Sequence, residues 1–154
     1  MTARTSAGTT LGISATLPAT FDEAGFDAVT HTLIGEVTDI GGDIGRVYQL
    51  VTHQPLASRA DVKKKGGYNS GSVTVSLAID DDDAGQQLAE AALNSDANYS
   101  FALTLQDGSI RYFEAIVMSF PVNVGGRDAI TSGQIMLEIT AQDDGSDFVK
   151  KAAA

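Results

Sequence analysis

Residues 72–79 read SVTVSLAI and residues 99–106 read YSFALTLQ, and these two stretches decide the fold. In both, aliphatic or aromatic side chains alternate with small or polar ones, which is the period of a β-strand with one buried face. Residues 134–141 (QIMLEITA) repeat the pattern. Residues 110–124 (IRYFEAIVMSFPVNV) are apolar on both faces, which predicts a central or doubly covered strand bent near Pro121.

One segment, from about residue 83 to residue 94, has helical periodicity instead. Ala84, Leu88, Ala91 and Ala92 fall near helical spacing, and the acidic run 80–83 stands where carboxylates cap free N–H groups. The sequence therefore predicts a mostly β fold, a β-sandwich or barrel with one flanking α-helix.

The remaining elements are shorter. Strands are predicted at residues 11–17, 31–40 and 46–52, and a turn at the glycines 41, 42 and 45. Residues 22–29 allow one or two helical turns capped by Asp22. We expect an N-terminal arm at residues 1–10, a domain at 11–142 and a C-terminal tail at 143–154. Residues 53–71 are expected to form a long loop or an extended hairpin.

Composition excludes several classes of protein. The chain has 154 residues, 20 acidic and 10 basic side chains, a net charge of −10 and no cysteine. The negative net charge argues against a protein that binds nucleic acid. The absence of cysteine excludes disulfides, thiol catalysis and Cys-ligated metals. Residues 1–77 carry 7 acids and 6 bases, whereas residues 78–154 carry 13 acids and 4 bases. The acidic excess therefore lies in the half that holds the alternating strands.

Neither targeting nor catalytic motifs stand out. No apolar run approaches the ~18–20 residues of a membrane helix, and the N-terminus lacks a secretory apolar region, so we expect synthesis in a cytoplasm and no membrane insertion. The two histidines, His31 and His53, have no metal-ligand spacing. The run that starts at Asp80 has alanine where a calcium loop needs oxygen ligands, at Ala84 and Ala91. We expect no enzyme activity, no metal and no cofactor.

Two groups of residues are candidates for binding. The first is the basic cluster Arg59, Lys63, Lys64 and Lys65, with Tyr68 nearby; it is a solvated loop, a salt-bridging protein interface or, last, a nucleic-acid contact. The second is the small polar face of the predicted strands, which is an ordinary hydrophilic face or a surface that lines or joins something. Its members are Ser72, Thr74, Ser76, Thr104, Gln106, Gln134, Glu138 and Thr140.

Three longer stretches resemble the major tail tube proteins of long, flexible-tailed (siphovirus-type) bacteriophages. They are SAGTTLGISATLPATFDEAGF, IGEVTDIGGDIGRVYQLVTHQPLASRADVKKKGGYNSGSVTVSLAID and DGSIRYFEAIVMSFPVNVGG, and the resemblance covers about residues 5–142. It implies a β-sandwich with a flanking helix, related to the tube protein of type VI secretion, whose strands complete a closed β-barrel when six subunits form a ring.

The resemblance further implies that rings stack into a virion tail tube through which viral DNA passes into the host without specific binding. The implied partners are other copies of the chain, a tape measure protein, a tail terminator and a distal tail protein. We expect Lys63, Lys64 and Lys65 to meet the acids 80–83 of a neighbouring subunit, and Gln134 and Glu138 to face the lumen. The acids concerned are Asp80, Asp81, Asp82 and Asp83.

Three other functions stay open at this point. The chain is a related ring protein (a secretion tube, a tail terminator or a distal tail hub), a monomeric β-sandwich binding module, or an enzyme. A binding module would need exposed aromatic side chains, but only 6% of residues are aromatic and there is no tryptophan.

Overall fold

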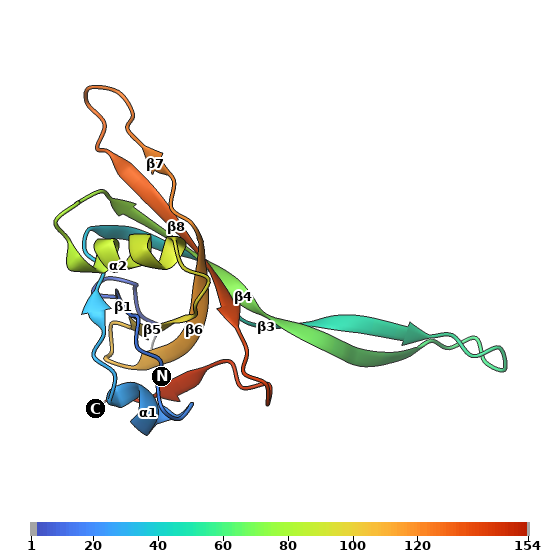
Figure 1. The fold of residues 1–154 in the computed structure, drawn as a ribbon. Coiled ribbons are helices and arrows are strands. Elements are labelled where there is room, and N and C mark those ends of the chain that lie inside the picture. The colour runs from blue at the N-terminus through green and yellow to red at the C-terminus, as the bar shows by residue number, and fades with distance from the viewer. Residues whose placement is uncertain (1–2, 154) are drawn as a thin grey trace.

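In the computed structural model, which describes residues 3–153, the alternating stretches are strands of one nine-stranded antiparallel sheet (Figure 1). Its order is β2-β1-β5-β6-β8-β4-β3, with β7 paired to β8 and β9 paired to β6. The predicted mostly β fold is confirmed. The strands are β1 Thr10–Ser14, β2 Thr32–Leu33, β3 Val37–His53, β4 Val62–Ala78, β5 Tyr99–Thr104, β6 Ile110–Ser119, β7 Val122–Asn123, β8 Ser132–Thr140 and β9 Val149–Lys151.

The main core lies on the face that the alternating apolar side chains share. Phe101 of β5 stacks on Phe113 of β6, with ring centroids 5.5 Å apart, and both side chains are fully buried. Helix α2 (Ala84–Leu93) closes this face with Ala89 and Ala92. It begins where the sequence predicted, because the Asp83 carboxylate accepts a hydrogen bond from the Gln86 N–H at 2.9 Å.

A second, smaller core lies on the opposite face of β5 and β6. Ala102 and Tyr112 alternate with the main-core residues, so they point to the other side of the sheet. There they are covered by Phe26 of the short helix α1 (Glu23–Asp27), whose ring centroid lies 5.0 Å from that of Tyr112. The Asp22 side chain caps α1 by accepting from the Gly25 N–H at 2.7 Å, as the sequence predicted.

Strand β9 holds the C-terminal residues against this second core. The expected tail is therefore partly a strand, paired with the start of β6. Lys151 donates to both carboxylate oxygens of Asp27, at 3.0 and 2.9 Å, and the Tyr112 hydroxyl donates to the same carboxylate at 2.8 Å. Burial and the Asp27 carboxylate raise the pKa of Tyr112 to about 12.

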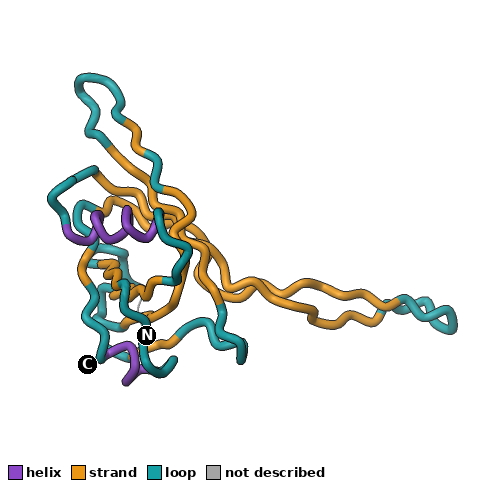
Figure 2. The backbone as a smooth tube through the Cα atoms, in the orientation of Figure 1, coloured by secondary structure: helices purple, strands orange, loops and turns teal. Residues whose placement is uncertain are grey.

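The outer parts of β3 and β4 leave the body as a long two-stranded arm (Figures 1 and 2). We call residues 46–70 the hairpin arm. The segment expected as a loop or extended hairpin is thus a strand from Val62 onward, and only its tip, residues 54–61, lacks strand structure. Backbone pairing with β3 orders it, from His53 opposite Val62 to Tyr48 opposite Tyr68.

The turn predicted at the glycines 41, 42 and 45 is wrong, because all three lie inside β3. The β3–β4 register shifts between Ile44 and Val47, which marks a β-bulge at the root of the arm. Gly42 has a φ of +92°, and a Cβ there would lie 2.4 Å from the Ser72 carbonyl oxygen. These glycines therefore permit a bend and a close strand approach without ending the strand.

No helix among residues 3–153 is long and apolar enough to cross a membrane.

Candidate assembly surfaces

The hairpin arm exposes apolar side chains that no part of its own chain covers. Its pairing supplies backbone hydrogen bonds, but none of the buried core residues lies between 46 and 69. An uncovered apolar surface of this kind on a projecting element is a candidate site of contact with another molecule. The exposed apolar residues of the arm are Val47, Tyr48, Leu50, Val51, Leu56 and Val62.

The basic cluster found in the sequence lies on the outer half of the same arm. Arg59 is at the tip, and Lys63, Lys64 and Lys65 follow at the start of β4, all of them exposed. The Lys65 ammonium lies 4.8 Å from the centroid of the Tyr48 ring. Within residues 3–153 the other three basic side chains form no ion pair.

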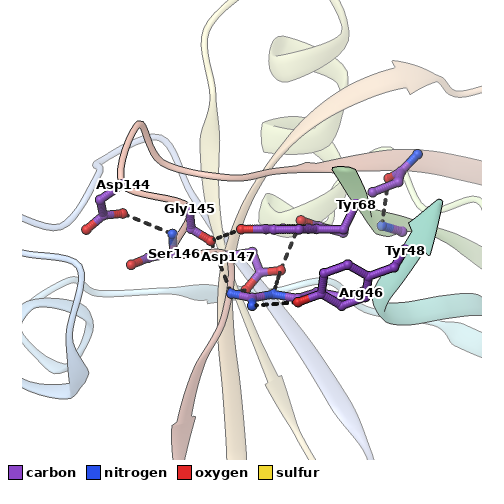
Figure 3. A network of polar contacts seen from close by, with 10 residues as sticks. Arg46, Tyr48, Tyr68, Asp144, Gly145, Ser146 and Asp147 are labelled. Carbon is purple, nitrogen blue, oxygen red and sulfur yellow. Dashed lines mark hydrogen bonds and ion pairs between the residues drawn. The ribbon is translucent and has the colours of Figure 1, made fainter. Parts of the chain in front are cut away.

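The root of the arm is fastened to the C-terminal turn by a network of polar contacts (Figure 3). Arg46 donates to both carboxylate oxygens of Asp147, at 2.9 and 3.1 Å, and its guanidinium lies over the Tyr68 ring at 4.4 Å. The Tyr68 hydroxyl donates to the Gly145 carbonyl at 2.5 Å, and the Ser70 hydroxyl donates to Asp147 at 3.1 Å. Tyr68, expected as an inter-subunit contact, therefore has a role within its own chain.

Asp147 is the centre of this network, with only 4% of its surface exposed. Burial on its own would raise its pKa, but the hydrogen bonds from Arg46 and Ser70 outweigh burial and hold the pKa below its ordinary value of 3.8. The same bidentate contact raises the pKa of Arg46. Since the folded state favours the carboxylate, this group stabilises the fold above about pH 3.8, and that stability is lost as the pH falls through the lowered pKa.

Removing the arginine of this network is expected to destabilise the fold. Arg46→Ala leaves a buried carboxylate with Ser70 as its remaining side-chain donor, and we expect a loss of about 2 kcal/mol in urea unfolding at pH 7. The loss should shrink toward pH 3, where Asp147 is protonated in the variant.

Arg127→Ala is the matched control. Its partner is Asp128, and the two side chains are 92% and 86% exposed, so its loss should stay within about 0.5 kcal/mol. Equal losses from the two variants would contradict a structural role for the Arg46 network.

A second candidate surface is the outer face of β3, β4 and β8, which we call the polar sheet face. Side chains directly opposite in antiparallel strands share a face, so the register sets its rows. Its charged members are all acidic. The rows are Asp39–Ser76–Gln134, Gly41–Thr74–Met136 and Asp43–Ser72–Glu138.

The register corrects the membership of this face. Asp39 and Asp43 belong to it, but sequence reasoning missed them because it placed a turn at the neighbouring glycines. Met136, which is 38% exposed, interrupts the polar residues at the middle of the face. Thr104 lies outside this face, at the end of β5, which is separated from β8 by β6, and Gln106 lies in the turn after β5. Thr140 alternates with Glu138 along β8, so it lies on the same face of that strand, opposite Glu114 of β6.

The acidic run between β4 and α2 divides into two parts. The Asp83 carboxylate is used within its own chain, because it accepts hydrogen bonds from the Gly35 N–H at 3.0 Å and from the Gln86 N–H. Asp80, Asp81 and Asp82 are exposed. Among the described residues these three form no ion pair, so their charges are available to a partner.

One serine–histidine pair has a geometry that resembles a catalytic dyad. Ser100 Oγ lies 3.3 Å from His31 Nε2, but Ser100 is fully buried and its hydroxyl donates to the Thr16 carbonyl at 2.8 Å. The pair therefore satisfies polar groups inside the fold. Residues 3–153 also contain no group of three or more His, Cys, Asp or Glu side chains able to hold a metal ion.

A curved antiparallel sheet closed by one helix and extended by a long hairpin arm is the tail-tube fold. Among solved structures, the chain resembles a subunit of the SPP1 tail tube, with a TM-score of 0.65 and 14% identity over 94% of this chain and 76% of that one.

Two further solved structures resemble this chain, and the alignment covers a larger share of each of those chains than of the SPP1 subunit. A subunit of the tail of an empty gene transfer agent particle, solved with C6 symmetry, has a TM-score of 0.62 and 12% identity over 92% of this chain and 96% of that one. A subunit of the sheath/tube terminator structure of the PVC contractile injection system has a TM-score of 0.68 and 10% identity over 99% of both chains. No protein-family profile and no curated protein sequence matches this chain.

Proposed function

We propose that this chain is the structural subunit of a phage-type tail tube. In the proposed assembly, six copies form a ring, and rings stack into a hollow conduit for viral DNA. The observation that carries the proposal is the hairpin arm, whose exposed apolar surface and unpaired basic residues have no use in an isolated chain. The tail-tube fold supports it, since the similar proteins are components of tails and tubes.

The sheet also has the open edges that ring closure needs. In the described residues the sheet path ends in β3 on one side and in the two-residue β2 on the other. Unpaired edges invite pairing with another chain, and a contact between two different edges closes into a ring when the rotation allows. We propose that the strands of neighbouring copies join across these edges into one barrel, with the polar sheet face toward the lumen.

The proposal places the protein in the virion tail, with itself as its main partner. Tape measure, terminator and distal tail proteins would meet it inside and at the two ends of the tube. Passage of DNA requires no reaction, and an acidic wall without stacking aromatics would repel phosphates and let the strand slide.

A second candidate is a terminator ring at the end of a tube, which the likeness to the contractile terminator structure supports. Electron microscopy of the purified protein separates the two functions. Long hollow tubes are expected for a tube subunit, and isolated rings for a terminator. A protein that stays monomeric at every concentration and salt condition would overturn both proposals.

A further inference from the structure

A narrow groove lies between α2, the end of β4 and the segment that joins β6 to β7. Its apolar lining comes from Ile79, Leu93, Phe120 and Val122. The volume is about 130 Å³, whereas pockets for drug-sized molecules measure roughly 300–1,000 Å³. The groove is thus suited to one protein side chain rather than to a small-molecule ligand.

Acidic side chains surround this apolar lining. Asp80 and Asp81, which follow β4, and Glu90 of α2 also line the groove. All three are exposed, and within residues 3–153 none of them forms an ion pair. An occupant that places an apolar side chain in the groove would therefore be favoured by positive charge around that side chain.

The tip of the hairpin arm has this combination of groups. Leu56 is fully exposed at the tip, and it is followed by Arg59, Lys63 and Lys64. The arm tip therefore combines one exposed apolar side chain with several positive charges, as the groove combines an apolar lining with acidic side chains.

We propose, on the basis of the proposed self-assembly, that the arm tip of one subunit docks in the groove of a second copy. Leu56 occupies the apolar lining, and Arg59, Lys63 and Lys64 face Asp80, Asp81 and Glu90. The contact is between subunits because the arm points away from its own body (Figure 1). Each copy then offers one tip and one groove, a head-to-tail contact that propagates along an assembly.

Disulfide trapping tests the docking directly, because the chain has no cysteine of its own. The test variant is Leu56→Cys with Val122→Cys, two exposed positions whose replacement leaves the core intact. The matched control is Leu56→Cys with Ala91→Cys, because Ala91 is exposed on α2 but does not line the groove. Oxidised tubes of the test variant should give a ladder of linked chains on a non-reducing gel, at least tenfold more than the control.

A charge exchange gives a second readout. Lys63→Glu with Lys64→Glu should abolish tube formation, and adding Asp81→Lys with Glu90→Lys to the same chain should restore it. Tubes that form normally while the test pair links no more than the control would overturn the docking but leave the tube function intact. A failed charge rescue would also overturn it. The absence of tubes from the unaltered protein would instead contradict the proposed function.

Discussion

A chain whose hairpin arm is cut back to its root is expected to fold normally and form no tubes. The design removes residues 49–67 and joins Tyr48 to Tyr68 through Asn-Gly. These two tyrosines are directly opposite in the β3–β4 register, and their ring centroids lie 5.2 Å apart. Asn-Gly suits a two-residue hairpin turn, so the shortened strands keep their pairing.

Normal folding and failed assembly of the shortened chain are expected for separate physical reasons. The removed residues contribute nothing to either buried core, so the thermal midpoint should stay within about 3 °C of the unaltered chain. Assembly should fail because the deletion takes away most of the exposed apolar surface of the arm and the unpaired basic residues. Circular dichroism during heating measures the folding, and negative-stain electron microscopy with sedimentation measures the assembly.

Gln49→Ala with Gln54→Ala is the control for this deletion. Both glutamines are exposed on the arm, and their replacement leaves its length, charge and apolar surface unchanged, so normal tubes are expected. Tubes of ordinary length from the shortened chain would show that the arm has no part in assembly.

The elements that alternate in sequence were predictable because burial on one face leaves a period of two. Strand β8 and helix α2 follow their patterns, and the Asp83 cap marks the start of the helix. Strand β5 has the alternating sequence but is buried on both faces, because Ala102 on its second face packs against Phe26. These features are local, since a strand face or a helix cap depends on residues a few positions apart.

The root of the arm was not predictable in the same way. Glycines such as Gly42 signal a turn or a bulge equally well, and the choice depends on pairing with residues near Gly71, far along the chain. The outer arm is exposed on both faces, so it has no alternation to detect. Only its hydrogen bonds to β3 make residues 62–71 a strand.

The residues of the candidate surfaces differ in the same way: some could be selected from local sequence patterns, and others depend on contacts far along the chain. The basic cluster and the serine and threonine residues of β4 could be selected from sequence because each is contiguous or alternating. Asp39 and Asp43 could not, since their place beside Ser76 and Ser72 follows from the β3–β4 register. The Arg46–Asp147 network joins residues about a hundred positions apart, and sequence spacing carries no signal for such a contact.

Reversing the charge of the polar sheet face is expected to turn a surface that repels DNA into one that holds it. Gln134→Lys adds one positive charge and Glu138→Lys adds two, so each subunit gains three. Gln134 is exposed and Glu138 is half-buried on the outer face of β8, so the variant should fold and assemble. Repeated in every ring, the lysines would bind phosphates with an affinity that falls steeply between 50 and 200 mM salt.

The measurement is cryo-electron microscopy of assembled tubes soaked with a short DNA duplex at 50 mM salt. Density along the tube axis is expected in the lysine variant and none in the unaltered tube. The charge-matched control is Asp96→Lys with Ala97→Lys, which also adds three charges, at exposed positions between α2 and β5. If the Gln134→Lys, Glu138→Lys tubes bind DNA only on their outer wall, the polar sheet face does not line the lumen.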